Sequence, residues 1–327
     1  PIRLEEHDLI ISASVGIATF PNCATNAASL MKCADVAMYR AKDNGRNQIQ
    51  CYSSQLHIQI KQRIELEQDL RKAMKNGEFA LQYQPQFAPE TDTMQGVETL
   101  IRWQHPKKGL IPASHFMPIA EDIGLVEKIN AWALDTACGQ FAQWREQNHS
   151  LDFNLSVSIN LSTFQVNQND FLQCIDDTLA KHNIPHQRLE FEIKERTLSK
   201  SPKTTAILNS LSAKGIVLAL ADFGTGYSSL TQLKEHPFQV LKINKTFIHS
   251  IADNSEDALF LKAINAFSKT LGLQIIAKGV ETQAQKNLCK VLNFDRLQGY
   301  YFSKPISAEL FEQIFLTQKP LTPPIDH

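Results

Sequence analysis

Eight short apolar runs recur along the chain from residue 79 onward, and amphipathic helical patterns separate most of them. The runs are Phe79–Gln84, Val97–Trp103, Phe153–Ile159, Leu189–Ile193, Ile216–Leu220, Val240–Ile243, Gln274–Ala277 and Leu297–Phe302. The helical patterns are Ile123–Gln147, Gln168–His182, Pro202–Lys214, Ser228–His236, Ala258–Leu271 and Gln283–Leu292. Eight strands with helices between them, in roughly 250 residues, predict an α/β fold of the (β/α)8 barrel type.

The stretch Gly215–Leu230 shows where chemistry would be placed in such a barrel. Its apolar run, Ile216–Leu220, has no polar face, which is typical of a strand covered on both sides. The run ends at Asp222, and Gly224 and Gly226 then allow the backbone to turn. Barrel enzymes carry their active sites at the carboxyl ends of the strands, so Asp222 is a candidate functional carboxylate. A solvated turn aspartate is the alternative.

Other polar residues also lie within or directly after the apolar runs. The full set is Glu98, Asn160, Glu192, Asp222, Lys242, Asn244, Lys278, Glu281 and Gln298. Buried polar groups are costly unless they contact a ligand, a metal ion or each other. We therefore expect these side chains to meet at the barrel mouth, either in a functional site or in structural ion pairs.

The residues before the barrel form a separate part of the chain. Leu9–Phe20 and Asn47–Tyr52 are strand-like, and Ala27–Asn44 between them is helical. About 50 residues of this kind cannot enclose a core, so we interpret them as the end of a larger domain. The charged helix Leu56–Asn76 is interpreted as a connector, with dimer formation as the alternative. The predicted domains are 1–53, a linker helix at 54–77, the barrel at 78–318 and a tail at 319–327.

Composition narrows the expected location and partners. The 327 residues include 33 basic and 34 acidic side chains, for a net charge of −1, so no global field favours DNA, RNA or an anionic membrane. Six cysteines without a CxxC pair indicate reduced thiols and a cytoplasmic location. No apolar run is long enough to span a membrane, so membrane association would need segments outside this chain. The first residue is Pro1, and we expect a piece of a longer protein.

The chain resembles the EAL domain family in eight blocks that occur in the family's order. The blocks are Gln84-Pro85, Glu98-Thr99-Leu100 with Arg102-Trp103, Asn160-Leu161-Ser162, Glu192-Ile193-Lys194-Glu195, Asp222 to Leu230 (DFGTGYSSL), Leu241-Lys242-Ile243, Gly279-Val280-Glu281-Thr282 and Gln298-Gly299-Tyr300. EAL domains are bacterial cyclic di-GMP phosphodiesterases and receptors. The resemblance covers roughly Leu66 to Leu316. The front piece, with SVGIA and ADVAMYRAKDNGRNQ, resembles the end of a GGDEF (diguanylate cyclase) domain without its signature loop, so no cyclase activity is predicted.

The resemblance implies roles for individual residues. Active EAL enzymes hydrolyse cyclic di-GMP to pGpG with two Mg²⁺ or Mn²⁺ ions. By resemblance, the metal-ligand positions are Glu98, Asn160, Glu192 and Asp222, and Lys242 corresponds to a lysine near the attacking water. Glu281 belongs to the same site, and Glu195 corresponds to a residue that steadies the loop after Asp222.

The predicted ligand contacts form a larger set around the same mouth. They are Gln84, Leu100, Arg102, Asp222, Lys242, Lys278, Glu281, Gln298 and Phe302. Arg102 would hold a phosphate or a guanine edge, and Phe302 would stack on a base. A place in the barrel core is the alternative for Phe302.

Three departures from the family pattern bear on activity. Ala221 replaces the first of two acidic residues, Asn244 replaces the aspartate of LKID, and Lys278 replaces the glutamate before GVET. Thr99 in place of the signature alanine is a milder change. Family sites carry seven carboxylates and one lysine at these positions. This chain keeps Glu98, Glu192, Asp222 and Glu281 and has the two lysines Lys242 and Lys278, so the local charge changes from −6 to −2.

The size of these charge effects predicts loss of the metal site. At an effective dielectric of about 20, unit charges about 4 Å apart interact by roughly 4 kcal/mol, so a charged Lys278 would oppose a divalent ion by roughly 8 kcal/mol. We therefore expect no cofactor, and a receptor in which Lys278 and Lys242 offset the phosphates of cyclic di-GMP. The alternatives are a slow phosphodiesterase using Mg²⁺ or Mn²⁺ and a scaffold that binds no nucleotide. A homodimer and an unidentified downstream protein are the expected protein partners.

Overall fold

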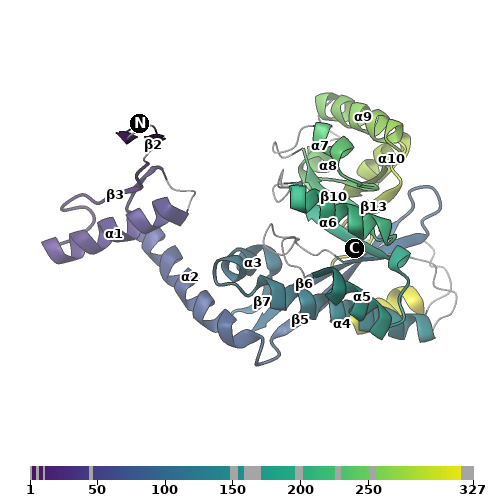
Figure 1. Ribbon diagram of the computed structural model, residues 1–327, viewed down its shortest axis with the longest axis horizontal. Helices are drawn as coiled ribbons and strands as arrows, with labels where there is room; N and C mark the ends of the chain where they lie inside the picture. The colour runs from purple at the N-terminus through teal and green to yellow at the C-terminus, as the bar shows by residue number, and fades with distance from the viewer. Residues whose placement is uncertain are drawn as a thin grey trace. The chain divides into compact units, whose positions relative to one another are not determined.

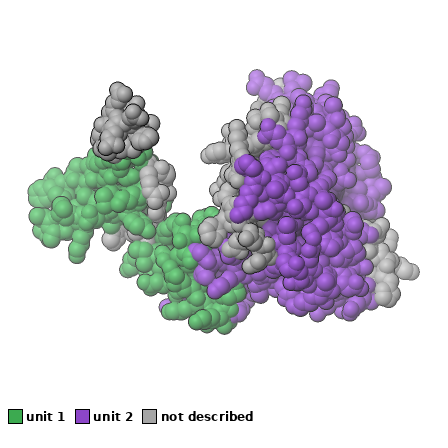
Figure 2. Space-filling model, viewed as in Figure 1, with its two compact units in different colours: residues 1–76, 118–123 green, residues 77–117, 124–327 purple. Residues whose placement is uncertain are grey.

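The computed structural model describes residues 2–4, 7–9, 12–43, 47–147, 154–157, 171–195, 202–224, 230–250 and 255–317. The chain divides into two compact units (Figure 2). Unit 1 contains Pro1–Asn76 and Pro118–Ile123, and unit 2 contains Gly77–Met117 and Gly124–His327. The domain boundaries predicted from the sequence stay a prediction, because the two units are defined by contacts between residues.

Unit 1 contains the strand–helix–strand pattern expected from the sequence. Its elements are β1 (Ile2–Leu4), β2 (His7–Leu9), β3 (Val15–Ile17), α1 (Ala27–Asp43), β4 (Ile49–Cys51) and α2 (Ser54–Ala73). β3 and β4 pair in parallel, as a crossover through a helix requires. Gly16 lies directly against α1, because a Cβ atom at this position would come within 2.1 Å of the Ala34 carbonyl oxygen.

Unit 2 is built on eight strands that pair into a closed ring. Helices lie around these strands in Figure 1. The strands are β5 (Phe79–Phe87), β6 (Met94–His105), β8 (Asn154–Val157), β9 (Leu189–Lys194), β10 (Val217–Phe223), β11 (Val240–Ile243), β12 (Gln274–Lys278) and β13 (Arg296–Gln298). Each strand from β6 to β13 in this set pairs in parallel with the next, and β5 pairs with both β13 and β6. The predicted (β/α)8-type barrel is confirmed.

The first strand differs from a regular (β/α)8 barrel. β5 runs antiparallel to both of its neighbours. It is joined to β6 by a short connection, in which Asp92 has a φ of 53°, and no helix intervenes. A connection of this length permits only an antiparallel pair, since parallel neighbours need a crossover of a dozen residues or so. A further strand, β7 (Gly109–Pro112), pairs with the end of β6.

Helices follow most of the parallel strands. They are α3 (Ala113–Asp122), α4 (Val126–Gln147), α5 (Phe171–Lys181), α6 (Pro202–Ala213), α7 (Leu230–Glu235), α8 (Lys245–Ser250), α9 (Ser255–Thr270), α10 (Gln283–Val291) and α11 (Ala308–Phe311), with a 3₁₀ turn at His186–Arg188 and a π-helical turn at Glu312–Leu316. Six of the helices lie where the periodicity predicts them. The sequence did not predict α3, α8 and α11. α8 and α11 are too short for a period to show, and α3 contains Pro118.

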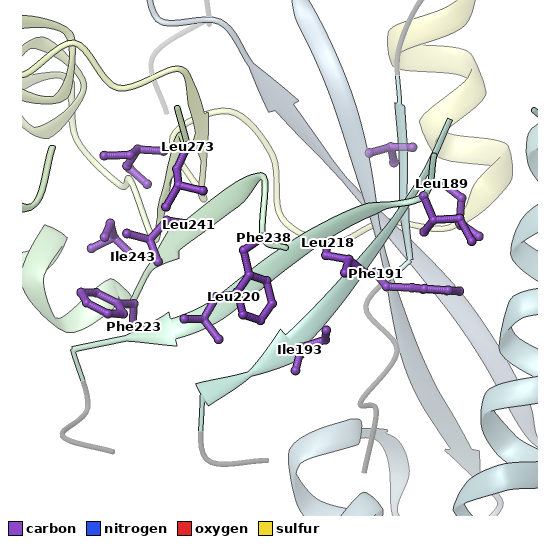
Figure 3. Close-up of a cluster of buried hydrophobic side chains, with 14 of the residues drawn as sticks. Leu189, Phe191, Ile193, Leu218, Leu220, Phe223, Phe238, Leu241, Ile243 and Leu273 are labelled. Carbon is purple, nitrogen blue, oxygen red and sulfur yellow. The ribbon is translucent and has the colours of Figure 1, made fainter. Parts of the chain in front are cut away.

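Alternation along the strands separates a helix-covered core from the barrel interior. Leu189, Phe191 and Ile193 of β9 pack in one cluster with leucines and isoleucines of β10 and β11 (Figure 3). Because successive side chains of a strand point to opposite faces, the intervening residues Glu190 and Glu192 point into the barrel. The barrel interior therefore receives charged side chains from strands whose outer faces are apolar.

The unit 2 helices do not change the expectation about membranes. No helix in the described ranges is long and apolar enough to cross a bilayer. All six cysteines are free thiols. A cytoplasmic location stays a prediction.

Candidate functional site

A cavity of about 290 Å³ lies at the carboxyl end of the barrel strands. It is lined by Gln84, Glu98, Leu100, Asp222, Asn244, Lys245, Lys278, Gly279, Glu281, Gln298, Gly299 and Tyr300. Eight of these residues belong to the sets predicted from the sequence, and they come from six different strands or from the residues that directly follow them. The structure thus brings the predicted residues together, while their roles toward a ligand stay predictions.

The Lys278 ammonium lies between two buried carboxylates. Its Nζ atom is 3.1 Å from Oε1 of Glu98 and 2.8 Å from Oε1 of Glu192. The side chains of Glu98 and Glu192 are 2% and 4% exposed, and that of Lys278 is 20% exposed. Lys278 ends β12, whereas the two glutamates come from β6 and β9. A protein cation therefore occupies the space between two positions that the EAL resemblance assigns to metal ligands.

Lys242 lies deeper in the barrel than the sequence suggested. Its side chain is fully buried, and Nζ is 2.7 Å from Glu190 and 2.8 Å from Glu192. Arg296 donates a further ionic hydrogen bond to Glu190 at 3.2 Å. Lys242 does not line the cavity, so its predicted contact with a ligand has no geometric support in this structure.

Glutamine side chains connect these ion pairs into a closed circuit. Gln298 donates to Glu98 at 2.7 Å and accepts from Gln86 at 3.1 Å. Gln86 in turn accepts from Arg296 at 3.0 Å. We call the resulting circuit the buried charge ring; its members are Lys278, Glu98, Gln298, Gln86, Arg296, Glu190, Lys242 and Glu192. It contains three carboxylates and three cations.

The buried charge ring balances its own charge. Burying an ion pair is tolerated when hydrogen bonds satisfy both partners, and each member of the ring has at least two polar contacts within it. Neutrality is reached without any ion from solution. Glu190, Gln86 and Arg296 were not predicted as site residues, although each lies two positions from a predicted residue on the same strand face.

The electrostatics of the ring hold Glu192, Lys242 and Lys278 in their charged forms. Burial raises the pKa of Glu192, but Lys242 and Lys278 outweigh this and hold the pKa at about 2. Burial lowers the pKa of Lys278, but Glu192 and Glu98 raise it by more than burial lowers it. The pKa of Lys278 therefore lies above its ordinary value. The same opposition, with Glu190 and Glu192 as the raising groups, leaves the pKa of Lys242 raised. At neutral pH Glu192 is ionised and both lysines are protonated.

Asn244 links Asp222 to the first turn of α8. Asp222 has a φ of 57°, and its Oδ1 atom accepts a hydrogen bond from the Asn244 amide at 3.2 Å. The Asn244 Oδ1 atom accepts from the backbone and the hydroxyl of Thr246, at 3.0 and 2.9 Å. An aspartate at position 244 could accept from Thr246 but could not donate to Asp222. Ala221, beside Asp222, is fully buried and contributes no polar atom.

Besides Lys242, two further predicted ligand contacts lie outside the cavity lining. Arg102 donates to Gln82 Oε1 at 2.7 Å, and burial lowers its pKa. Phe302 stacks on Phe87 with ring centroids 4.8 Å apart and packs against the barrel core. This packing matches the alternative interpretation of Phe302 as a core residue. Their contacts with a ligand stay predictions.

Two further predictions depend on segments around the barrel mouth. Asn160, a predicted metal ligand, lies outside the described residues. Glu195 is buried at the end of β9, but the loop it was expected to steady continues into residues 225–229, which are also outside the described ranges. Neither role is tested.

Comparison with known proteins places the chain in a family. The EAL domain family model matches residues 67–305, and the diguanylate cyclase GGDEF domain model matches residues 1–48. The chain belongs to the EAL domain family. The resemblance inferred from the sequence is confirmed, as is its GGDEF portion at the front.

Two relatives and one solved structure illustrate the likeness. The chain is 39% identical over 310 residues to the bifunctional diguanylate cyclase/cyclic di-GMP phosphodiesterase MucR of Pseudomonas aeruginosa, covering 94% of this chain and 45% of MucR. It is 40% identical over 321 residues to the signaling protein YkoW of Bacillus subtilis, covering 97% and 39%. It superposes on the MucR phosphodiesterase in complex with cyclic di-GMP with a TM-score of 0.71 at 39% identity, covering 76% of this chain and 99% of that one. The chain spans less than half the length of these two curated relatives.

The residues present do not fit the divalent metal pair that EAL phosphodiesterases use. Within the described ranges, no group of three or more His, Cys, Asp or Glu side chains is arranged to hold a metal ion. Oxygen atoms of Glu98 and Glu192, which would face such ions, accept hydrogen bonds from Lys278. A divalent ion needs several oxygen ligands, and a neighbouring ammonium would repel it by roughly 8 kcal/mol at about 4 Å.

Acid should destabilise the barrel through Glu192. The pKa of this group is held at about 2 in the folded chain, against an ordinary value of 4.5. A depressed pKa contributes stability that is fully present above pH 4.5 and is lost as the pH falls toward 2, and the difference corresponds to roughly 3 kcal/mol. Urea unfolding at pH 5 and pH 3 should show about 2 kcal/mol of this loss, because the folded group is still mostly ionised at pH 3. Lys278→Met should reduce the loss, because it raises the pKa of Glu192; an identical pH dependence in the two proteins would contradict the assignment.

Proposed function

We propose that this chain is a cyclic di-GMP receptor that binds the dinucleotide without metal ions and does not hydrolyse it. The observation that carries the proposal is the Lys278 ammonium held between Glu98 and Glu192. Hydrolysis in this family needs two metal ions at these carboxylates, and the ammonium takes their place. Binding does not need the ions, because the buried charge ring is already neutral.

The choice of ligand is supported by the relatives and by the cavity. MucR is named as a cyclic di-GMP phosphodiesterase, and its structure contains that dinucleotide. The cavity of this chain keeps Gln84, Leu100, Glu281 and Gln298 among its lining residues, which the family resemblance associates with the ligand. A dinucleotide carries two phosphate charges. Carboxylates without counter-ions would repel them, and here the buried carboxylates of Glu98 and Glu192 have a counter-ion from the protein.

Calorimetric titration of the chain with cyclic di-GMP tests the proposal. We expect the same dissociation constant in EDTA and in millimolar Mn²⁺, and no pGpG by chromatography after prolonged incubation. Steady release of pGpG in Mn²⁺ that Glu98→Ala abolishes would instead establish the slow phosphodiesterase. No heat and no product at high protein concentration would favour the nucleotide-independent scaffold. A homodimer and a downstream protein partner stay predictions.

A further inference from the structure

Two lysines inside the barrel, Lys278 and Lys242, already have carboxylate partners. Lys278 contacts Glu98 and Glu192, and Lys242 is fully buried between Glu190 and Glu192. An incoming phosphate would have to displace these contacts, and Lys242 has no exposed atom with which to meet it. Lys242, the lysine that the family motif contains, is therefore buried and does not line the cavity.

Lys245 is placed differently. It is the first residue of α8, it lines the cavity and it is exposed to solvent. Within the described part of the chain, its ammonium has no hydrogen bond or ion pair. Its charge is therefore available to a ligand in a way that the charges of Lys278 and Lys242 are not.

The backbone around Gly279 brings Lys245 to the cavity wall. Gly279 follows Lys278 directly and has a φ of 80°. A Cβ atom at Gly279 would come within 2.5 Å of the Lys245 Cβ atom and 3.3 Å of His249 Nε2. A glycine is needed here both for the positive φ and for this close approach. The Lys245 side chain thus starts beside the end of β12, next to the cavity opening.

The other charges of the cavity lining have local partners. Glu98 accepts from Lys278 and Gln298, and Asp222 accepts from Asn244. Glu281 lies 3.3 Å from His249, one turn after Lys245 on α8. The lining carboxylates are thus each engaged by a neighbour, and among the described residues that line the cavity Lys245 is the cation without such a partner.

We propose that Lys245 is the phosphate-binding lysine of this cavity. The inference rests on the proposed function, since it assigns the contact made by a phosphate of the bound cyclic dinucleotide. An ammonium on a flexible stem can reach a phosphate oxygen without a fixed geometry and donate a charge-assisted hydrogen bond. Lys245 adds a contact that the family motif did not predict and replaces Lys242 in that role.

Three variants measured by calorimetric titration with cyclic di-GMP in EDTA test the proposal. Lys245→Met should weaken binding by at least about tenfold, as expected for a lost hydrogen bond to a charged group, and should make the affinity less sensitive to salt. Lys245→Arg keeps the charge and should retain most of the affinity. Lys262→Met removes an exposed lysine on α9 that does not line the cavity, and it should bind like the unaltered chain.

The outcomes separate this inference from the proposed function. Unaltered binding by Lys245→Met, with the unaltered chain binding normally, would overturn the role of Lys245 alone. No binding by the unaltered chain would overturn both proposals. Thermal unfolding of each variant checks that the exposed substitution leaves the fold intact.

Discussion

Replacing Lys278 with methionine should lower the free energy of unfolding by about 3–5 kcal/mol, which is the usual cost of removing one partner from a buried ion pair. The ammonium contacts two carboxylates that are 2% and 4% exposed. Its loss leaves the buried charge ring with three carboxylates and two cations, and the two carboxylates that it contacts are themselves almost fully buried. Methionine fills much of the same space, so the loss measures charge rather than a cavity. Urea unfolding at pH 7 gives the value.

A surface ion pair of the same barrel provides the matched control. Lys269 contacts Asp295 at 2.7 Å, but its side chain is 46% exposed. Lys269→Met should cost less than about 1 kcal/mol, because solvent screens an exposed pair. A loss for Lys278→Met as small as that of the control would mean that the ammonium does not hold the two glutamates.

Introducing three carboxylates together should create metal-dependent hydrolysis. The triple variant Ala221→Asp, Asn244→Asp and Lys278→Glu removes the ammonium and adds three negative charges around Asp222. Hard divalent ions then have the oxygen ligands they require, and two ions can be bridged by carboxylates. We expect pGpG from cyclic di-GMP in Mn²⁺ and none in EDTA, measured by chromatography.

Stability gives the triple variant a second readout. Without metal the added carboxylates repel one another, so the variant should unfold at a lower temperature than the unaltered chain. Mn²⁺ at about 100 times its dissociation constant should then stabilise the variant by about 2.7 kcal/mol, while the unaltered chain should not respond. Adding Glu98→Ala to the triple variant should abolish the activity. If the triple variant forms no product and is not stabilised by Mn²⁺, the cause of inactivity lies elsewhere in the site.

The sequence predicts the barrel well because its strands are buried on both faces. Runs such as Ile216–Leu220 are too short for a typical helix, and their spacing leaves few other folds. The antiparallel β5 was not predicted, since the direction of a strand depends on how long its connection is. α8 is only six residues long and was not predicted either. Because Lys245 is its first residue, the position of Lys245 at the cavity was not predicted.

The family motifs predicted which residues belong to the candidate site, but not how deeply each side chain is buried. Family motifs identify Glu98, Lys278 and Gln298, and the structure places all three at the cavity. Strand alternation also puts Lys242 inside the barrel, but a motif does not say whether a side chain faces the mouth or the floor. That depends on its partners, and Glu190 and Arg296 belong to no functional motif. Phe302 shows the same limit, since its neighbour Phe87 is more than two hundred residues away in the sequence.

The claim that an ammonium replaces the metal pair is tested most directly by anomalous diffraction from crystals of the unaltered chain grown with Mn²⁺ and cyclic di-GMP. We predict that the dinucleotide occupies the cavity, that Lys278 stays within hydrogen-bond distance of Glu98 and Glu192, and that no manganese peak lies beside them. Two ordered manganese ions at these glutamates, with the lysine displaced, would contradict the account.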